Sequence, residues 1–174
     1  FVGMLLFMVI QAAAELIDLQ MGLGMASLID PTNQNTSVVG QFYYLIAMLI
    51  FLSVNAHHMV IQGLADSFSI IPLGRMSFDP GATGAILAVF DRMFVAAIKI
   101  GGPIVGVILL TDVALGILAR TVPQLNVLVV GFPAKIFVGL ATMVVAMPAV
   151  VVVMHNLFGG LYGDIHVISQ ALVR

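Results

Sequence analysis

The chain has 174 residues, of which 61% are hydrophobic and only 8% charged, with a mean hydropathy of +1.19 and a formal net charge of -2. Soluble domains carry roughly 25% charged residues, so this composition predicts a membrane protein. The small net charge provides no basic face for nucleic acid, and the lack of cysteine excludes disulfides, thiolate metal ligands and cysteine nucleophiles.

The first apolar stretch, residues 1–14, predicts a helix shorter than the roughly 20 residues needed to span a bilayer. It leads into residues 15–31, which are too apolar for a solvated loop. Gly22 and Gly24 disfavour a helix interior by roughly 1 kcal/mol each, and Asp30-Pro31 is a turn signal. We therefore expect a non-helical apolar segment here, buried where protein or a cavity surrounds it.

A second apolar stretch follows a polar turn at residues 32–36. Residues 42–56 are dense in Phe, Tyr, Ile and Leu and predict a spanning helix. The polar group at residues 55–58 indicates either the end of this helix or a polar face on a helix that continues to Gly63. Residues 66–80 read as a connection, because serine, glycine and proline interrupt any period.

The third apolar block, residues 81–110, differs from the others because it contains charged side chains, Asp91, Arg92 and Lys99. Arg92 and Lys99 are seven positions apart, so they share one face of a helix. A charge at the bilayer centre costs about 2.5 to 3.5 kcal/mol, so both cations should face protein or water. Gly101-Gly102-Pro103 is expected to kink or split the helix.

The last third of the chain predicts two more helices after a connection at residues 111–135. Residues 136–154 are uncharged and about 28 Å long as a helix, close to the roughly 30 Å of a hydrocarbon core. Residues 155–174 predict a weakly amphipathic helix that begins after Gly159-Gly160. Together the segments indicate an all-α, polytopic membrane protein built from long helical hairpins.

Several motifs resemble one family. They are QMGL at 20–23, Asp-Pro at 30–31, NAHH at 55–58, ARTVPQLNV at 119–127 and VGFPAK at 130–135. In this order and spacing the chain resembles the FliR family of flagellar biosynthetic proteins. It departs from the family pattern at Asp18 and Thr32, where small residues or glycine are usual.

The resemblance implies a subunit of a helical hetero-oligomeric gate in the bacterial inner membrane, at the flagellar basal body. FliR-like chains assemble with FliP-like and FliQ-like subunits and an FlhB-like switch protein, and the pore passes unfolded flagellar proteins. By the same resemblance, residues 1–80 form a FliP-like part whose N-terminal helices are missing. Residues 81–174 form a FliQ-like helical hairpin with its tip at 111–135, followed by a C-terminal helix.

The family's pore is closed by a plug segment, which maps onto residues 15–31. The predicted plug or gate residues are Glu15, Leu19, Gln20, Met21, Gly22, Leu23, Gly24 and Met25. Methionine side chains adapt to irregular shapes, glycine permits tight backbone turns, and an apolar constriction can gate by dewetting. The alternative is a packed re-entrant connection with no moving role.

The charged residues of the second half invite two interpretations. They are Asp91, Arg92, Lys99, Asp112, Arg120 and Lys135. Ionisable residues within membranes often form proton or ion relays. We prefer polar contacts between subunits, because the FliR-like family assembles through stacked hairpins.

No residue pattern predicts a metal, a cofactor or catalysis. His57 and His58 lie about 100° apart on a helix, which is poor geometry for two ligands of one metal. Glu15 and Asp18 could pair as acid and base, but no nucleophile accompanies them. The chain is therefore not expected to be an enzyme. An alternative function is a secondary transporter or ion channel with a broken helix at 101–103.

Overall fold

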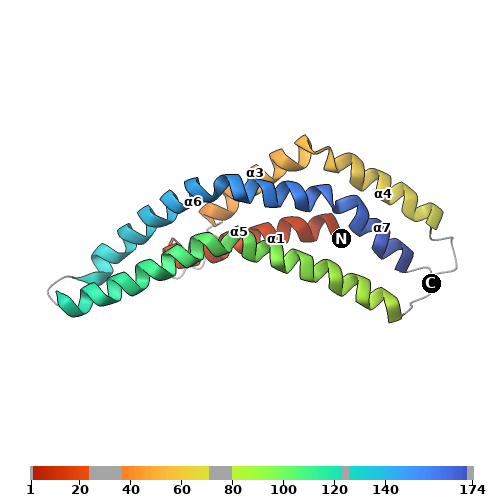
Figure 1. Cartoon of the computed structure of the whole chain (residues 1–174). Coiled ribbons are helices and arrows are strands. Elements are labelled where there is room, and N and C mark those ends of the chain that lie inside the picture. Colours follow the sequence, from red (N-terminus) through yellow and green to blue (C-terminus); the bar gives the residue numbers. More distant parts are fainter. Residues whose placement is uncertain (1, 24–36, 71–79, 123–125, 172–174) are drawn as a thin grey trace, which may run out of the picture.

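The computed structural model describes residues 2–23, 37–70, 80–122 and 126–171, and all the regular elements in these ranges are helices. They are α1 (Val2–Met21), α3 (Val38–Ser53), α4 (Ala56–Ile70), α5 (Pro80–Thr121), α6 (Val127–Gly159) and α7 (Leu161–Ala171). The predicted all-α fold is confirmed. Figure 1 shows α5 and α6 as a long hairpin with α1 lying along it, while α4 runs beside α7.

The first helix is longer than predicted. α1 ends at Met21 rather than near residue 14, so the first seven residues of the 15–31 segment are helical and the expectation of a short helix was wrong. The buried side chains of α1 recur every three or four residues, as one face of a helix requires; they include Leu6, Ile10, Ala14, Ile17 and Met21. This stripe packs against α3 and α5. Because the packing continues to Met21, α1 remains helical through the polar residues that suggested an earlier end.

The second apolar stretch forms two helices, where the sequence suggested one. α3 ends at Ser53 and α4 begins at Ala56, and the two are bent by 67°. Asn55 has a positive φ of 56°, a conformation that asparagine tolerates better than most residues. Its carbonyl accepts from the backbone N–H of His58 at 3.0 Å, which starts the new helix. The polar group at 55–58 therefore marks a helix break.

The connection predicted at residues 66–80 begins too early, because α4 continues to Ile70. The serines that suggested a loop are accommodated inside the helix. The hydroxyl of Ser67 donates to the carbonyl of Leu64, and that of Ser69 to the carbonyl of Asp66, each at 2.7 Å. A serine hydroxyl that donates to a carbonyl of the preceding turn has its hydrogen bond within the helix, so the serine does not end the helix.

The third block forms one continuous helix of 42 residues, α5, with Pro103 inside it. The alternative that α5 is split at 101–103 is therefore wrong. Gly101 is buried, and a Cβ there would lie 3.6 Å from the backbone oxygen of Ala13. A Cβ at this distance is in ordinary van der Waals contact, so alanine would fit here and only a side chain larger than alanine would push α1 and α5 apart.

The hairpin tip is much shorter than the predicted 111–135 connection. α5 runs to Thr121 and α6 starts at Val127, so helices occupy most of that range. Thr111 and Thr121 each donate a hydroxyl hydrogen bond to a carbonyl of their own helix. Near the tip, Gly131 of α6 is buried beside Leu115 of α5.

The final helix begins where the sequence predicted. α6 ends at Gly159 and α7 starts at Leu161. By length and composition, three stretches of the described residues could span a membrane: Val2–Met21, Thr83–Thr121 and Val129–Gln170. The bent pair of α3 and α4 would make a fourth if it forms one span. The predicted polytopic membrane character is confirmed.

Candidate functional site

The end of α1 lies inside the predicted plug segment and has a defined cap. Gly22 has a φ of +82°, and its N–H donates to the carbonyl of Leu19 at 3.2 Å. The N–H of Leu23 reaches back to the carbonyl of Asp18 at 3.0 Å. This pattern is a Schellman-type C-cap, for which glycine is the preferred residue because it has no Cβ to clash. Gly22 therefore ends the helix here.

Two contacts bind this helix end to α6. The Met21 side chain is fully buried, and its Sδ, Cε and Cγ atoms lie 2.8 Å from the position a Cβ would take on Gly139. A Cβ on Gly22 would likewise lie 2.7 Å from Cδ1 of Phe132. Glycine at residues 22 and 139 leaves room for these side chains. The base of the predicted plug is thus packed against the hairpin.

The predicted gate residues are not all in one environment. Glu15 and Leu19 are exposed, Gln20, Gly22 and Leu23 are half-buried, and Met21 is in the core. Gly24 and Met25 lie outside the described residues. Met21 packs within this chain, and its role as an adaptable pore residue stays a prediction.

Asp18 joins the end of α1 to the start of α3. Its side chain is only 4% exposed, and both carboxylate oxygens accept from the backbone N–H of Val39 at 3.3 Å. Ser37 completes the cap by accepting from the N–H of Gly40 at 2.7 Å. The N-terminus of a helix has unpaired N–H groups and a partial positive charge, so it stabilises a carboxylate. The departure from the family pattern at residue 18 therefore has a structural role.

Replacing Asp18 by alanine should lower the free energy of unfolding by about 1–2 kcal/mol, because the N–H of Val39 loses its acceptor in a buried setting. Asp18→Asn retains a capping oxygen and should lose less. Glu15→Ala, an exposed change on the same helix, should stay within about 0.5 kcal/mol of the wild type. Unfolding in mixed detergent micelles measures all three. An Asp18→Ala variant as stable as the wild type would contradict the cap.

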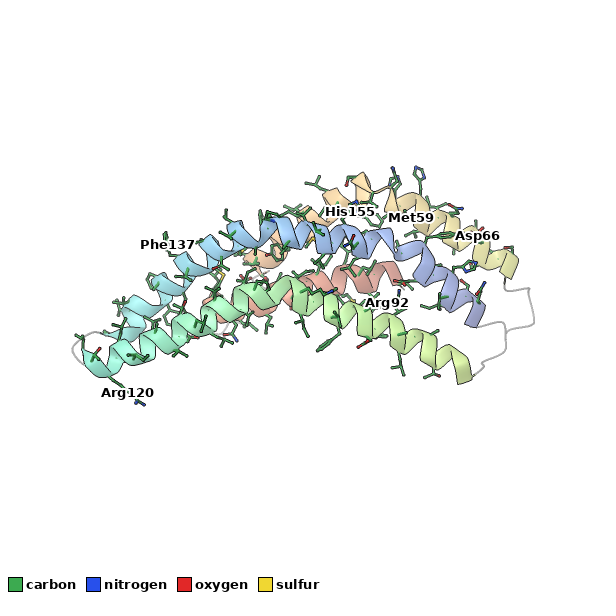
Figure 2. All side chains as sticks on the ribbon, viewed as in Figure 1. Met59, Asp66, Arg92, Arg120, Phe137 and His155 are labelled. Carbon is green, nitrogen blue, oxygen red and sulfur yellow. The ribbon has the colours of Figure 1, made fainter. Side chains whose placement is uncertain are left out.

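The cations of α5 face one cavity, as their spacing predicted. Arg92 and Lys99 both line a cavity of about 300 Å³ between α5, α6 and α7, together with Asp91. Arg92 forms an ion pair with Asp164 of α7 at 2.6 Å, and Figure 2 labels Arg92 on α5. Sequence reasoning missed Asp164. Its position in the first turn of α7, just after the Gly159-Gly160 break, was the available signal.

A second ion pair lies nearer the hairpin tip. The ammonium of Lys135 on α6 contacts a carboxylate oxygen of Asp112 on α5. Arg120 is exposed in the last turn of α5, and its side chain points away from the hairpin in Figure 2. Arg92, Asp112 and Lys135 thus have partners within this chain. Their contacts with other subunits stay a prediction.

A hydrogen bond fixes the bent helix pair to the end of the chain. The hydroxyl of Tyr162 on α7 donates to a carboxylate oxygen of Asp66 on α4 at 2.8 Å. Gly63 packs against Ile165 along the same contact. The sequence offered no sign of this pair, because its members are 96 residues apart.

Two of the histidines are neighbours at the start of α4. The rings of His57 and His58 lie 4.3 Å apart at the start of α4. Among the residues that the structure describes, no three His, Cys, Asp or Glu side chains form a group that could hold a metal ion.

The chain matches one protein family over nearly its whole length. A family model described as bacterial export proteins, family 1, covers residues 1–161. The flagellar biosynthetic protein FliR of Bacillus subtilis (strain 168) is 42% identical over 163 residues, which cover 90% of this chain and 63% of that protein. FliR of Escherichia coli (strain K12) is 32% identical over 157 residues, covering 90% of this chain and 60% of the relative.

A more distant relative carries a different name. The surface presentation of antigens protein SpaR of Shigella flexneri is 30% identical over 131 residues, covering 74% of this chain and 50% of the relative. The chain spans about three-fifths of the length of the FliR relatives it matches. The chain therefore belongs to the bacterial export proteins, family 1, and is a FliR-type membrane protein.

Proposed function

We propose that this chain is a structural and gating subunit of the flagellar type III protein export gate. Its family membership makes it a component of an export apparatus in the bacterial inner membrane at the flagellar basal body, and not an enzyme. The finer proposal is that residues 15–31 help to close the pore through which unfolded flagellar proteins pass. The family match over residues 1–161 carries this proposal.

The geometry on either side of the predicted plug supports a closing role. The chain leaves α1 at a capped helix end, where Met21 is buried beside Gly139. On the other side, Ser37 caps α3 two residues before Val39, and the backbone N–H of Val39 donates to Asp18. A segment that blocks a pore needs fixed ends, because a blocking group gains effective concentration when its attachment is short and rigid. Both flanks meet that requirement.

The proposed partners are FliP-like and FliQ-like subunits, an FlhB-like protein, membrane lipid and unfolded flagellar proteins. Large apolar side chains on the outer face of α6 support burial in an assembly or bilayer; Phe137, Val144 and Val145 are each at least 75% exposed. An apolar face of this kind marks a protein or membrane contact. Asp91 and Arg120, both exposed, are proposed to contact neighbouring subunits.

The proposal predicts an ion leak when the plug is shortened. Deleting residues 24–29 leaves α1, its cap and the Asp18 contact in place. Membranes containing the co-expressed gate subunits with this variant should conduct ions that the wild-type gate blocks, because a shortened segment no longer seals the constriction. Conductance across planar bilayers measures the leak, and native mass spectrometry verifies that the gate is assembled.

A matched deletion of residues 72–77, between α4 and α5, has the same length and should cause no leak. Replacing residues 24–29 by six glycines and serines separates loss of length from loss of apolar character. If both plug variants assemble and stay as tight as the wild type, the segment is a packed connection and the gating proposal fails.

A further inference from the structure

Two turns of α6 receive the end of α1. A Cβ on Gly139 would lie 2.8 Å from the Met21 side chain, and a Cβ on Gly22 would lie 2.7 Å from the ring of Phe132. Gly139 is buried and Phe132 is half-buried. We call Phe132 and Gly139 the seat, because they contact the last residue of α1 and the glycine that caps it.

An ion pair to α5 lies between the two residues of the seat. Lys135 follows Phe132 by three residues and precedes Gly139 by four, so all three lie on one face of α6. The ammonium of Lys135 contacts a carboxylate oxygen of Asp112 on α5, and the two side chains are only 23% and 35% exposed. Partly buried pairs are screened less than surface pairs. The pair therefore links α5 to the face of α6 that carries the seat.

The register of α6 against α5 depends on this pair. Lys135 is the one Asp, Glu, Lys or Arg residue in the 33 residues of α6, and Asp112 is the one charged residue of α5 between positions 100 and 119. A slip of one helical turn would exchange apolar contacts for similar ones. The same slip would separate the two charges and leave both partly buried and unpaired, which is costly. A single polar residue sets the register of coiled coils in this way.

The seat fits the end of α1 in only one register. Gly139 leaves room for Met21 because it has no side chain. The residues one turn before and one turn after it on α6, Lys135 and Met143, have long side chains. If α6 moved by a turn, one of these side chains would occupy the space that Met21 fills, and the end of α1 would have to leave the hairpin.

We propose that the ion pair of Lys135 and Asp112 positions the seat and so holds the end of α1 against the hairpin. Both are positioning residues, because they act on α1 through Phe132 and Gly139. The inference rests on the proposed gating function: if residues 15–31 close the pore, this pair fixes the helix end from which the closing segment leaves. Control of the plug then lies partly in the hairpin.

Hydrogen–deuterium exchange of the full chain in detergent tests the positioning role. The amides of Gly22 and Leu23 donate within the cap of α1, so they exchange when this helix end opens. Lys135→Met should speed their exchange about tenfold, the effect expected for losing a hydrogen bond between charged groups. Residues 6–14 of the same helix should exchange as in the wild type. Asp112→Asn, which keeps the side-chain shape, replaces Lys135→Met if the latter fails to fold.

Two further variants show whether the charge attraction is the cause. Combining Asp112→Lys with Lys135→Asp restores an ion pair of opposite direction and should restore slow exchange. Arg92→Gln breaks the other ion pair of α5, with Asp164, and should leave the cap of α1 unchanged. Unchanged exchange in Lys135→Met, or an increase spread over all of α1 or equalled by Arg92→Gln, would overturn the proposal. Fast exchange in the exchanged pair would overturn it as well.

Conductance of assembled gates separates this inference from the proposed function. If both are correct, membranes with the Lys135→Met gate leak ions and those with the exchanged pair stay tight. Faster exchange at Gly22 and Leu23 without a leak would keep the positioning role and overturn the gating role of residues 15–31. A leak from Lys135→Met with unchanged exchange would overturn the positioning role, because the pore would then open without release of α1.

Discussion

Replacing Met21 by alanine is expected to lower the free energy of unfolding by about 2–5 kcal/mol, the range for a large-to-small change in a packed core. The Met21 side chain is fully buried and fills the space beside Gly139, so alanine leaves a cavity between α1 and α6. Unfolding of the chain in mixed detergent micelles, followed by circular dichroism, measures the loss.

Met8→Ala is the matched control, because Met8 lies on the same helix and is 50% exposed. It should change stability by less than about 0.5 kcal/mol. The comparison also separates two roles for Met21. If Met21→Ala keeps full stability and the assembled gate leaks ions, Met21 faces the pore and the packing described above is not the one used in the gate.

Replacing Gly22 by alanine is expected to lower the free energy of unfolding by about 2–5 kcal/mol from two independent causes. A residue with a Cβ in the left-handed conformation costs roughly 1–2 kcal/mol, and the φ of Gly22 is +82°. The new Cβ would also lie 2.7 Å from Cδ1 of Phe132, and such overpacking adds about 1–3 kcal/mol. The same unfolding measurement reports the loss.

Two further variants separate these causes. Adding Phe132→Leu to Gly22→Ala should relieve the contact with the ring and leave the backbone cost. Gly116→Ala is the control for glycine removal, since a Cβ there meets nothing within 4 Å. It lies inside α5 and should raise stability by up to about 1 kcal/mol. A Gly22→Ala variant that gains stability like Gly116→Ala would contradict the cap geometry at the end of α1.

Helix existence could be predicted from the sequence, but helix ends could not. Apolar runs located α1, α3, α5 and α6, because a chain in an apolar solvent must satisfy its backbone within helices. The residues at which the helices end depended on packing against other helices of the chain. α1 continues to Met21 because its stripe of buried residues keeps packing against α3 and α5. α5 passes through Gly101 and Pro103 as one helix, and Gly101 lies buried against α1.

The site shows the same division. Periodicity correctly placed Arg92 and Lys99 on one face, since seven residues make nearly two helical turns. It gave no information about Asp164, which reaches Arg92 because α7 continues from the end of α6 alongside α5. In the sequence, Asp18 was only a departure from the family pattern within the predicted plug. Its partner Val39 lies 21 residues further along the chain, so local pattern did not predict their contact.

By itself, the sequence determined that this is an all-α membrane protein and, through its motifs, a FliR-type chain. Composition and short-range periodicity carry that information, because the solvent and the helical repeat act on each segment separately. Only the tertiary structure decided that Met21 belongs to the core, that Asp18 caps α3, and that two ion pairs lie about 30 Å apart along the hairpin. Those contacts join residues distant in the chain, so they follow from how the helices pack and not from local pattern.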